Sequence, residues 1–500
     1  MFSTSAVKLL TDYWLAVGIT ILACWILSNR YKRGLHRVPG PWLRSVSSLP
    51  RIWSVYRGFS HDDDLLLHRK YGSIVRLAPN TLSVSDPSEI NTIYGIGTKF
   101  IKSSFYSLAE AYDEEGVMPD PFVITNREYH TRMKRGAANA YSLNGLVQME
   151  PWIDPVTSRL VQILRAFSQT KEAVDIAELM QGYAMDAICA LTFGKDFNHM
   201  DGGDHLGFYK NNKFANDYMA IFGQFAWCHR YLLGNAQIQK LVYNGEGNAK
   251  MLQLCDAEIA IGRDNASEDG PMTFLQRLLL NQKQNPKSLT DRELVTHSFN
   301  NIAAGSDTTA IGLRSIIYNT LKDPRVHYKL TEEVRTSLKL PVTFVEANKL
   351  PYLSAVIKEG IRLHPSVGMI LARIVPEGGT VICGKPLQAG VEVGVNPWVL
   401  QRDPNVYTNP DQFYPDRWLP ENTPDDQLKA MNRSFIPFGQ GAHTCSGRWI
   451  STMELVKVIS TIFYMFDMEL VDGGKEYRYH NLWFTAQKGL VIKVNLAEGT

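Results

Sequence analysis

The sequence lacks paired cysteines. Its 500 residues include six cysteines, none of them in a CxxC pair: Cys24, Cys189, Cys228, Cys255, Cys383 and Cys445. A disulfide framework in a chain of this length would need more cysteines and a secreted context. The sequence therefore predicts that the globular part works in a reducing compartment. There, a functional cysteine would act through the reactivity of its thiol and not through a disulfide.

An excess of charge of either sign is also missing. Lys and Arg together number 52, and Asp and Glu together number 50. The sequence has no run of basic residues of the kind that binds a nucleic-acid phosphate backbone. We therefore expect no nucleic-acid partner. Hydrophobic residues make up 45% of the chain and charged residues 20%, which is typical of a folded protein with a large core.

One long hydrophobic run is present, at the N-terminus. Tyr13 to Leu27 carries no charge, and a span of about residues 9–28 approaches the ~20 residues of a transmembrane helix. The basic residues Arg30, Lys32 and Arg33 follow it and only Lys8 precedes it, which favours a cytosolic location for what comes next. A signal peptide would need a basic leader and a small-residue cleavage site, so an anchor is the better interpretation.

The rest of the chain has no low-complexity linker and no repeat. We predict an anchor over residues 1–30, a basic and proline-containing hinge over 31–41, and a single domain over 42–500. Helical periodicity predominates, for example in four segments: 180–193, 294–321, 352–363 and 449–466. Strands 74–77 and 81–84 flank a Pro-Asn turn, and 380–382 and 391–395 flank glycines in the same manner, so two hairpins are expected. The predicted fold is mainly α with a minor β-sheet.

A glycine-rich loop around Cys445 is the decisive motif. Residues 438–447 read FGQGAHTCSG and run directly into an apolar helix. A cysteine thiolate can hold haem iron in oxygen-activating enzymes, where it pushes electron density toward the iron and favours O–O cleavage. Loop N–H groups and a helix N-terminus can stabilise the thiolate, and glycines let the backbone approach a flat macrocycle. An ordinary buried cysteine is the alternative; a zinc site or a nucleotide loop would need further ligands or a third glycine.

This loop resembles the haem-binding loop of the cytochrome P450 family. The resemblance makes Cys445 the iron ligand and gives cofactor-binding positions to Phe438, Gly439, His443 and Gly447. His443 stands where the family usually has Arg, so binding of a haem propionate is expected to become sensitive to pH.

Three further motifs occur in the family's order. Glu359 and Arg362, at i and i+3 on a helix, resemble the family's buried ExxR pair, which Arg417 in the sequence YPDRW would complete. We interpret these three residues as structural, because a buried charge network must be fully bonded. AGSDTT at 304–309 resembles the family's oxygen-side helix motif and makes Asp307 and Thr308 the proton-delivery pair. Without the cysteine loop it would be a polar patch on a helix.

The resemblance also implies less specific positions. His130, Lys134 and Arg373 match propionate-binding positions of the family. Candidates for an apolar substrate pocket are Phe105, Met118, Phe122, Asn300, Ala303, Ala304, Val367, Met369, Trp483 and Phe484. Core packing is the alternative for each of them.

The resemblance extends over essentially the whole chain, and parts of it are similar to fungal enzymes near pisatin demethylase, many of which work in secondary metabolism. It implies a cytochrome P450 fold behind one transmembrane helix and haem b as cofactor. The expected reaction is oxidation of a small apolar molecule with O₂, by hydroxylation or by ring coupling, desaturation or epoxidation. NADPH would act only through a flavoprotein reductase, at the endoplasmic reticulum membrane with the catalytic domain in the cytosol. A haem-thiolate isomerase, dehydratase or peroxygenase that needs no reductase, and a non-catalytic haem sensor, are the alternatives.

Overall fold

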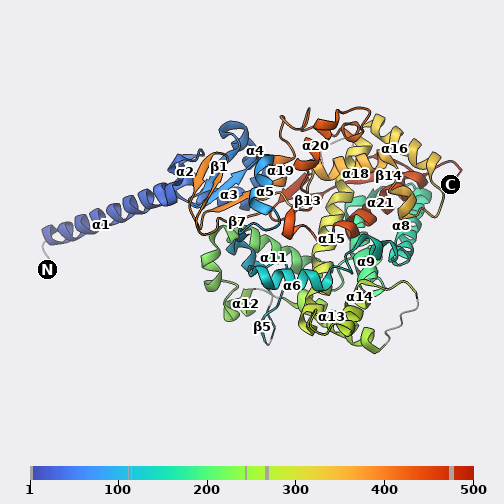
Figure 1. The fold of residues 1–500 in the computed structure, drawn as a ribbon, viewed down its shortest axis with the longest axis horizontal. Coiled ribbons are helices and arrows are strands. Elements are labelled where there is room, and N and C mark those ends of the chain that lie inside the picture. The colour runs from blue at the N-terminus through green and yellow to red at the C-terminus, as the bar shows by residue number, and fades with distance from the viewer. Residues whose placement is uncertain are drawn as a thin grey trace.

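Most of the chain is helical, as the sequence predicts, and its strands form small sheets in separate parts of the molecule (Figure 1). The computed structural model describes residues 4–499 except 111, 114, 243–244, 265–269 and 472–477. The four predicted helices are present with slightly wider or shifted bounds: α9 (Ile176–Phe193), α15 (Asp291–Lys322), α18 (Pro351–Leu363) and α21 (Arg448–Met465). A capping box between Thr290 and Glu293 fixes the start of the long helix α15.

The predicted anchor is the helix α1 (Thr4–Tyr31), which projects from the body (Figure 1). The stretch Asp12–Arg37 is long and apolar enough to cross a membrane, and its most apolar part is not buried against the body. The buried guanidinium of Arg76 donates to the carbonyls of Asn29 at 2.6 Å and Arg30 at 2.8 Å. These carbonyls lack partners inside the helix, so Arg76 both caps α1 and ties it to the first strand of the body.

A five-stranded sheet lies next to the base of α1, in the order β1-β2-β10-β7-β3, where β3 is Ile101–Lys102. Strands β1 (Ile74–Ala78) and β2 (Thr81–Val84) form the expected hairpin. The second expected hairpin is wrong: β8 (Thr380–Ile382) pairs with β9 (Lys385–Leu387), whereas β10 (Glu392–Val395) pairs with β2 and with β7 (Arg373–Ile374). A tight turn at Cys383 and Gly384, both with positive φ, closes β8 onto β9 before β10 begins.

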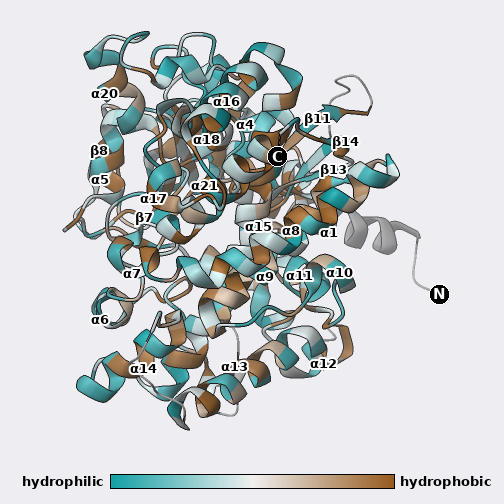
Figure 2. Ribbon diagram, turned by 90° about the vertical axis from the view of Figure 1, so that its right-hand side faces the viewer, coloured by the Kyte–Doolittle hydropathy of each residue, from teal (hydrophilic) through white to brown (hydrophobic). Residues whose placement is uncertain are grey.

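The main hydrophobic core is built around α9, α15 and α21. Hydrophilic and hydrophobic residues alternate along most helices, as expected for helices with one face in the core (Figure 2). Helix α9 is an exception, because nearly all its residues are buried.

A fully buried charge network lies behind the cysteine loop, as the ExxR resemblance implies. Arg362 binds both oxygens of Glu359, at 2.8 and 2.9 Å, and Arg417 donates to the same carboxylate at 3.1 Å. The indole of Trp418 and the backbone N–H of Tyr414 complete its shell, at 2.8 and 2.9 Å. Although burial acts to raise it, the pKa of Glu359 is lowered by the two arginines.

Gln401 connects this network to the cysteine loop. Arg362 donates to the carbonyl of Gln401 at 2.7 Å, and the Gln401 side chain accepts from the N–H of Ile436 at 3.0 Å. Ile436 lies two residues before the loop begins, and Gln401 is fully buried. The charge network therefore fixes the position of the chain at Ile436, just before the cysteine loop begins.

We expect Glu359→Ala to lower the free energy of unfolding by about 3–5 kcal/mol, because two guanidinium groups lose their buried counter-ion. Urea unfolding monitored by circular dichroism measures the change, with the exposed Glu421→Ala as control, expected within ~0.5 kcal/mol of wild type. Since the pKa of Glu359 is lowered, its contribution is present above the ordinary glutamate pKa and is lost as the pH falls through the lowered value. A variant as stable as wild type near neutral pH would contradict this role.

Candidate functional site

The cysteine loop is held by its own backbone and by a close approach to a neighbouring helix. The N–H of Cys445 donates to the carbonyl of Phe438 at 2.8 Å. Gly439 and Gly441 have φ of +68° and +67°, a region that favours glycine. A Cβ on Gly441 would lie 1.8 Å from the carbonyl oxygen of Tyr94, so only glycine fits there. Gly447 then precedes α21, whose N-terminus lies beside Cys445.

Cys445 borders space inside the protein. Its side chain is exposed, yet burial by the surrounding protein raises the pKa of its thiol. Both observations hold if the thiol faces an interior space and not bulk water. In α15, Ala304 is exposed and Thr308 half-buried, whereas Ile302 and Ala310 are buried. Ala304 and Thr308 share one helix face, so this face also borders open space.

Positive groups counteract the effect of burial on Cys445. The N–H of Gly447 and the cations of Lys134 and Arg448 act to lower the pKa of Cys445. The Lys134 ammonium donates to the carbonyls of Ala442 at 3.1 Å and Thr444 at 2.8 Å. These are the contacts that a thiolate metal ligand needs.

A cluster of five basic residues lies beside the loop: Lys102, His130, Lys134, Arg373 and His443. Lys102, in β3 (Ile101–Lys102), is directly opposite Arg373 in β7, although like charges at such positions repel. Burial, followed by the neighbouring cations, lowers the pKa of His443 to about 2 and that of His130 to about 3. Burial followed by Arg373 lowers the pKa of Lys102 to about 7.

This basic cluster fits a cofactor with two carboxylates. Within the described part of the chain, His443 Nδ1 and Arg373 Nε are buried without a hydrogen-bond partner. The ring centroids of His130 and His443 are 4.4 Å apart, so the structure brings these two predicted propionate positions together. The propionates of a haem would supply the missing negative charge and acceptors.

Asp307 and Thr308 lie at the middle of α15 but point to different partners. Asp307 accepts from Gln181 at 2.7 Å and from Asn212 at 3.0 Å, and burial raises its pKa. The Thr308 hydroxyl donates to the carbonyl of Ala304 at 2.8 Å. Asn212 also donates to the carbonyl of Ala303 at 3.0 Å, so two successive carbonyls of α15 have side-chain donors, as expected for a loosened helix.

Several predicted pocket residues form one aromatic cluster. Phe105, Met369 and Trp483 are buried together, with Val367 and Phe484 packed against them. The ring centroid of Phe122 is 5.9 Å from that of Trp483. Met118 is instead part of the main core, against which Ala303 packs. Ser366 donates to the carbonyl of Thr308 at 2.9 Å and so connects the cluster to α15.

The sequence did not single out three residues of this region. Lys102 and Asp120 lie in segments without a chemical motif, and Gln401 is an isolated glutamine. The carboxylate of Asp120 accepts from the amide of Asn300 at 2.7 Å, which joins the loop before α6 (Arg127–Ala137) to α15. Only the pairing of strands and helices brings these residues to the site.

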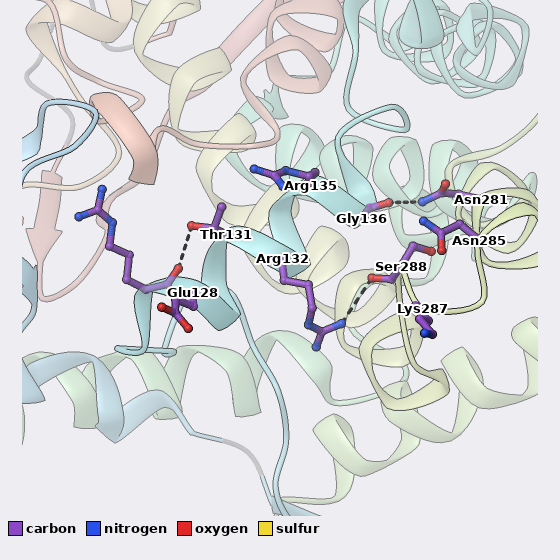
Figure 3. A pocket seen from close by; sticks show the side chains of 10 residues that line it. Glu128, Thr131, Arg132, Arg135, Gly136, Asn281, Asn285, Lys287 and Ser288 are labelled. Carbon is purple, nitrogen blue, oxygen red and sulfur yellow. Dashed lines mark hydrogen bonds between the residues drawn. The ribbon is translucent and has the colours of Figure 1, made fainter.

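An open surface pocket lies elsewhere, between α6 and α14 (Phe274–Gln284) (Figure 3). It is lined by polar residues that include Arg127, Arg132, Arg135 and Lys287. Arg132 is paired with Glu293. None of the predicted site residues lines this pocket, so it is distinct from the space beside Cys445.

Comparison with known proteins agrees with the motifs. The family model "Cytochrome P450" matches residues 39–494. The chain is 30% identical over 484 residues to cytochrome P450 monooxygenase cicH of Emericella nidulans, covering 94% of this chain and 95% of that protein. It is 32% identical over 460 residues to a cytochrome P450 monooxygenase of Aspergillus terreus, covering 88% and 92%. Identity to pisatin demethylase of Fusarium vanettenii is 31% over 482 residues, covering 94% and 92%. The chain therefore belongs to the cytochrome P450 family and is a cytochrome P450 monooxygenase.

Proposed function

We propose that this monooxygenase binds haem b through Cys445 and oxidises a small apolar metabolite in fungal secondary metabolism. The observations that carry the proposal are the accessible side chain of Cys445, the accessible face of α15 at Ala304 and Thr308, and the buried basic cluster beside the cysteine loop. When bound, the haem supplies the activation of O₂. The names of the relatives support the metabolic setting.

The basic cluster is the proposed binding site for the propionates. Arg373 and His443 have buried nitrogen atoms free to donate, and His130 stacks against His443. Lys134 has a second role beside the one the resemblance implies, because its ammonium binds two carbonyls of the loop. It therefore positions Cys445 and adds positive charge.

Asp307 and Thr308 are the proposed proton-delivery residues. Thr308 holds a hydroxyl on the face of α15 that borders the interior space. Asp307 reaches toward Asn212 in α11 (Phe208–Phe222), and the positive charge of Lys213 acts on it from the same helix. Lys213 is exposed, so protons would enter from the solvent side of α11 and pass through Asp307.

The aromatic cluster is the proposed apolar wall of the substrate site. Phe105, Trp483 and Phe484 present rings, while the alanines at 303 and 304 leave room at α15. Such a site holds an apolar molecule and orients it with few polar groups.

The proposed setting is the endoplasmic reticulum membrane. Residues 1–30 would anchor the chain, 31–41 form the hinge, and 42–500 form one catalytic domain in the cytosol. The exposed apolar surface of α1 and the basic residues after it support this orientation. An NADPH-dependent flavoprotein reductase in the same membrane would supply the electrons.

Cys445→Ser is expected to abolish the carbon monoxide difference band from which the family takes its name, because a hydroxyl cannot replace the thiolate. The reduced, haem-loaded wild type should show the band. Well-folded, haem-loaded wild type without it would rule out thiolate ligation. Turnover that is equally fast without the reductase would favour the isomerase, dehydratase or peroxygenase alternative.

Lys134→Met should weaken haem retention by about tenfold, since two charge-assisted hydrogen bonds to the loop are lost. The rate of haem transfer to apomyoglobin measures it. Lys287→Met removes the same charge from an exposed position and should leave the rate unchanged. Equal rates for both variants would show that Lys134 does not hold the loop.

Asp307→Asn should lower turnover by about 10²-fold, the size of a general acid–base contribution, while the carbon monoxide band remains. The amide keeps the shape and one acceptor for Gln181 or Asn212 but cannot pass a proton. A solvent deuterium isotope effect larger than that of wild type is also expected. Wild-type turnover in this variant would exclude the carboxyl from proton delivery.

A further inference from the structure

Two hydrogen-bond acceptors that have no partner among the described residues lie beside the aromatic cluster. One Asp120 oxygen, Oδ1, accepts from the N–H of Phe122 at 2.6 Å and from the Asn300 amide at 2.7 Å. Within the described residues, the other oxygen of Asp120 and the amide oxygen of Asn300 have no hydrogen-bond partner. Neither is among the buried atoms that lack one, so both are accessible.

These acceptors face the interior space and not bulk water. Asn300 lies four residues before Ala304 and eight before Thr308, on the same face of α15. Both Asp120 and Asn300 are half-buried. Burial raises the pKa of Asp120, so protein surrounds the carboxyl although part of it is accessible.

The pair also adjoins the aromatic cluster. Phe122, two residues after Asp120, has its ring 5.3 Å from Tyr106 and 5.9 Å from Trp483. The Lys102 ammonium does not occupy the free acceptors, because it donates to the carbonyls of Pro121 at 2.6 Å and Phe122 at 2.8 Å. Its charge balances that of Asp120, so a neutral ligand group fits better than a cation.

We propose that Asp120 and Asn300 bind a hydroxyl group of the substrate, a phenol or an alcohol on an apolar ring-containing skeleton. This inference rests on the proposed function, and it gives the substrate a chemical class. At 1.5 Å per residue, the eight residues from Asn300 to Thr308 place the hydroxyl roughly 12 Å along α15 from the proposed proton-delivery site. A rod-like molecule of two or more rings would span that distance. Asp120 acts here as a specificity residue, not as a catalytic one.

The structural alternative is that Asp120 only orders its loop by accepting from Phe122 and Asn300. Asp120→Asn separates the two roles. The amide oxygen keeps the acceptor for Phe122 and Asn300, whereas the free oxygen becomes an NH₂ donor. A loop-ordering role would survive this change, but acceptance of a hydroxyl hydrogen at this position would be lost.

The test compares 4-hydroxybiphenyl with 4-methoxybiphenyl, which lacks the donor hydrogen. Dissociation constants for the haem-loaded full chain in detergent are measured by probe fluorescence and by the haem spectrum. Wild type should bind the hydroxyl probe about tenfold tighter, the effect of a hydrogen bond to a charged group. In Asp120→Asn the ratio should fall to about twofold, because only the neutral amide oxygen of Asn300 then accepts the hydroxyl hydrogen. The exposed Glu421→Gln is the matched carboxylate-to-amide control and should keep the wild-type ratio.

Asn300→Ala provides a second variant if Asp120→Asn does not fold. It removes one acceptor and frees Asp120 to rotate, so the ratio should fall but stay above one. Equal binding of the two probes by wild type, no binding of the hydroxyl probe up to its solubility, or an unchanged ratio in Asp120→Asn would overturn the proposal. The carbon monoxide band distinguishes failure of this inference from failure of the proposed function. If it is present while the ratio is one, only this inference fails; if it is absent from haem-loaded wild type, the proposed function fails.

Discussion

The buried carboxylate of Glu359 is the constraint on which the site depends. Two guanidinium groups, an indole and a backbone N–H converge on it, and the same arginines bind carbonyls of residues 401–412. A buried charge network of this kind costs desolvation energy and is stable only when every group is bonded. Here it fixes the chain just before the cysteine loop through Gln401 and Ile436. The position of Cys445 therefore follows from ion pairing in the core, not from contacts of the loop alone.

An excess of buried positive charge lies on the other side of the cysteine loop. The pairing of β3 with β7 places Lys102 directly opposite Arg373. Burial, followed by these and other neighbouring cations, strongly lowers the pKa values of His130 and His443. A folded protein tolerates such a cluster when a bound anion completes it. The propionates of the proposed haem would do so here. The exchange of the family's usual Arg for His443 lowers the fixed charge, and the ring of His130 lies 4.4 Å from that of His443.

The proposed substrate site combines an apolar wall with a polar end. Aromatic rings from separate segments and two alanines of α15 would form the wall, and the acceptors of Asp120 and Asn300 would form the polar end. At the other end lies Thr308, with Asp307 behind it. An apolar molecule with one polar end has only one favourable orientation in such a space, because reversing it would bury an unpaired polar group.

The sequence by itself determined the family, the candidate iron ligand, the long helices and the candidate membrane helix. Each of these can be recognised from the spacing of residues within a single helix or loop. The ExxR pair, the cysteine loop and the helix motif of α15 each lie within ten residues. Tertiary structure alone decided what depends on separate segments. The 380–395 strands paired differently from the expected hairpin, since β10 finds its partners in β2 and β7. Lys102 opposite Arg373, Gln401 beside Ile436 and Asp120 beside Asn300 are contacts between residues 35 to 271 positions apart, by subtraction of their numbers, and no local pattern encodes such distances.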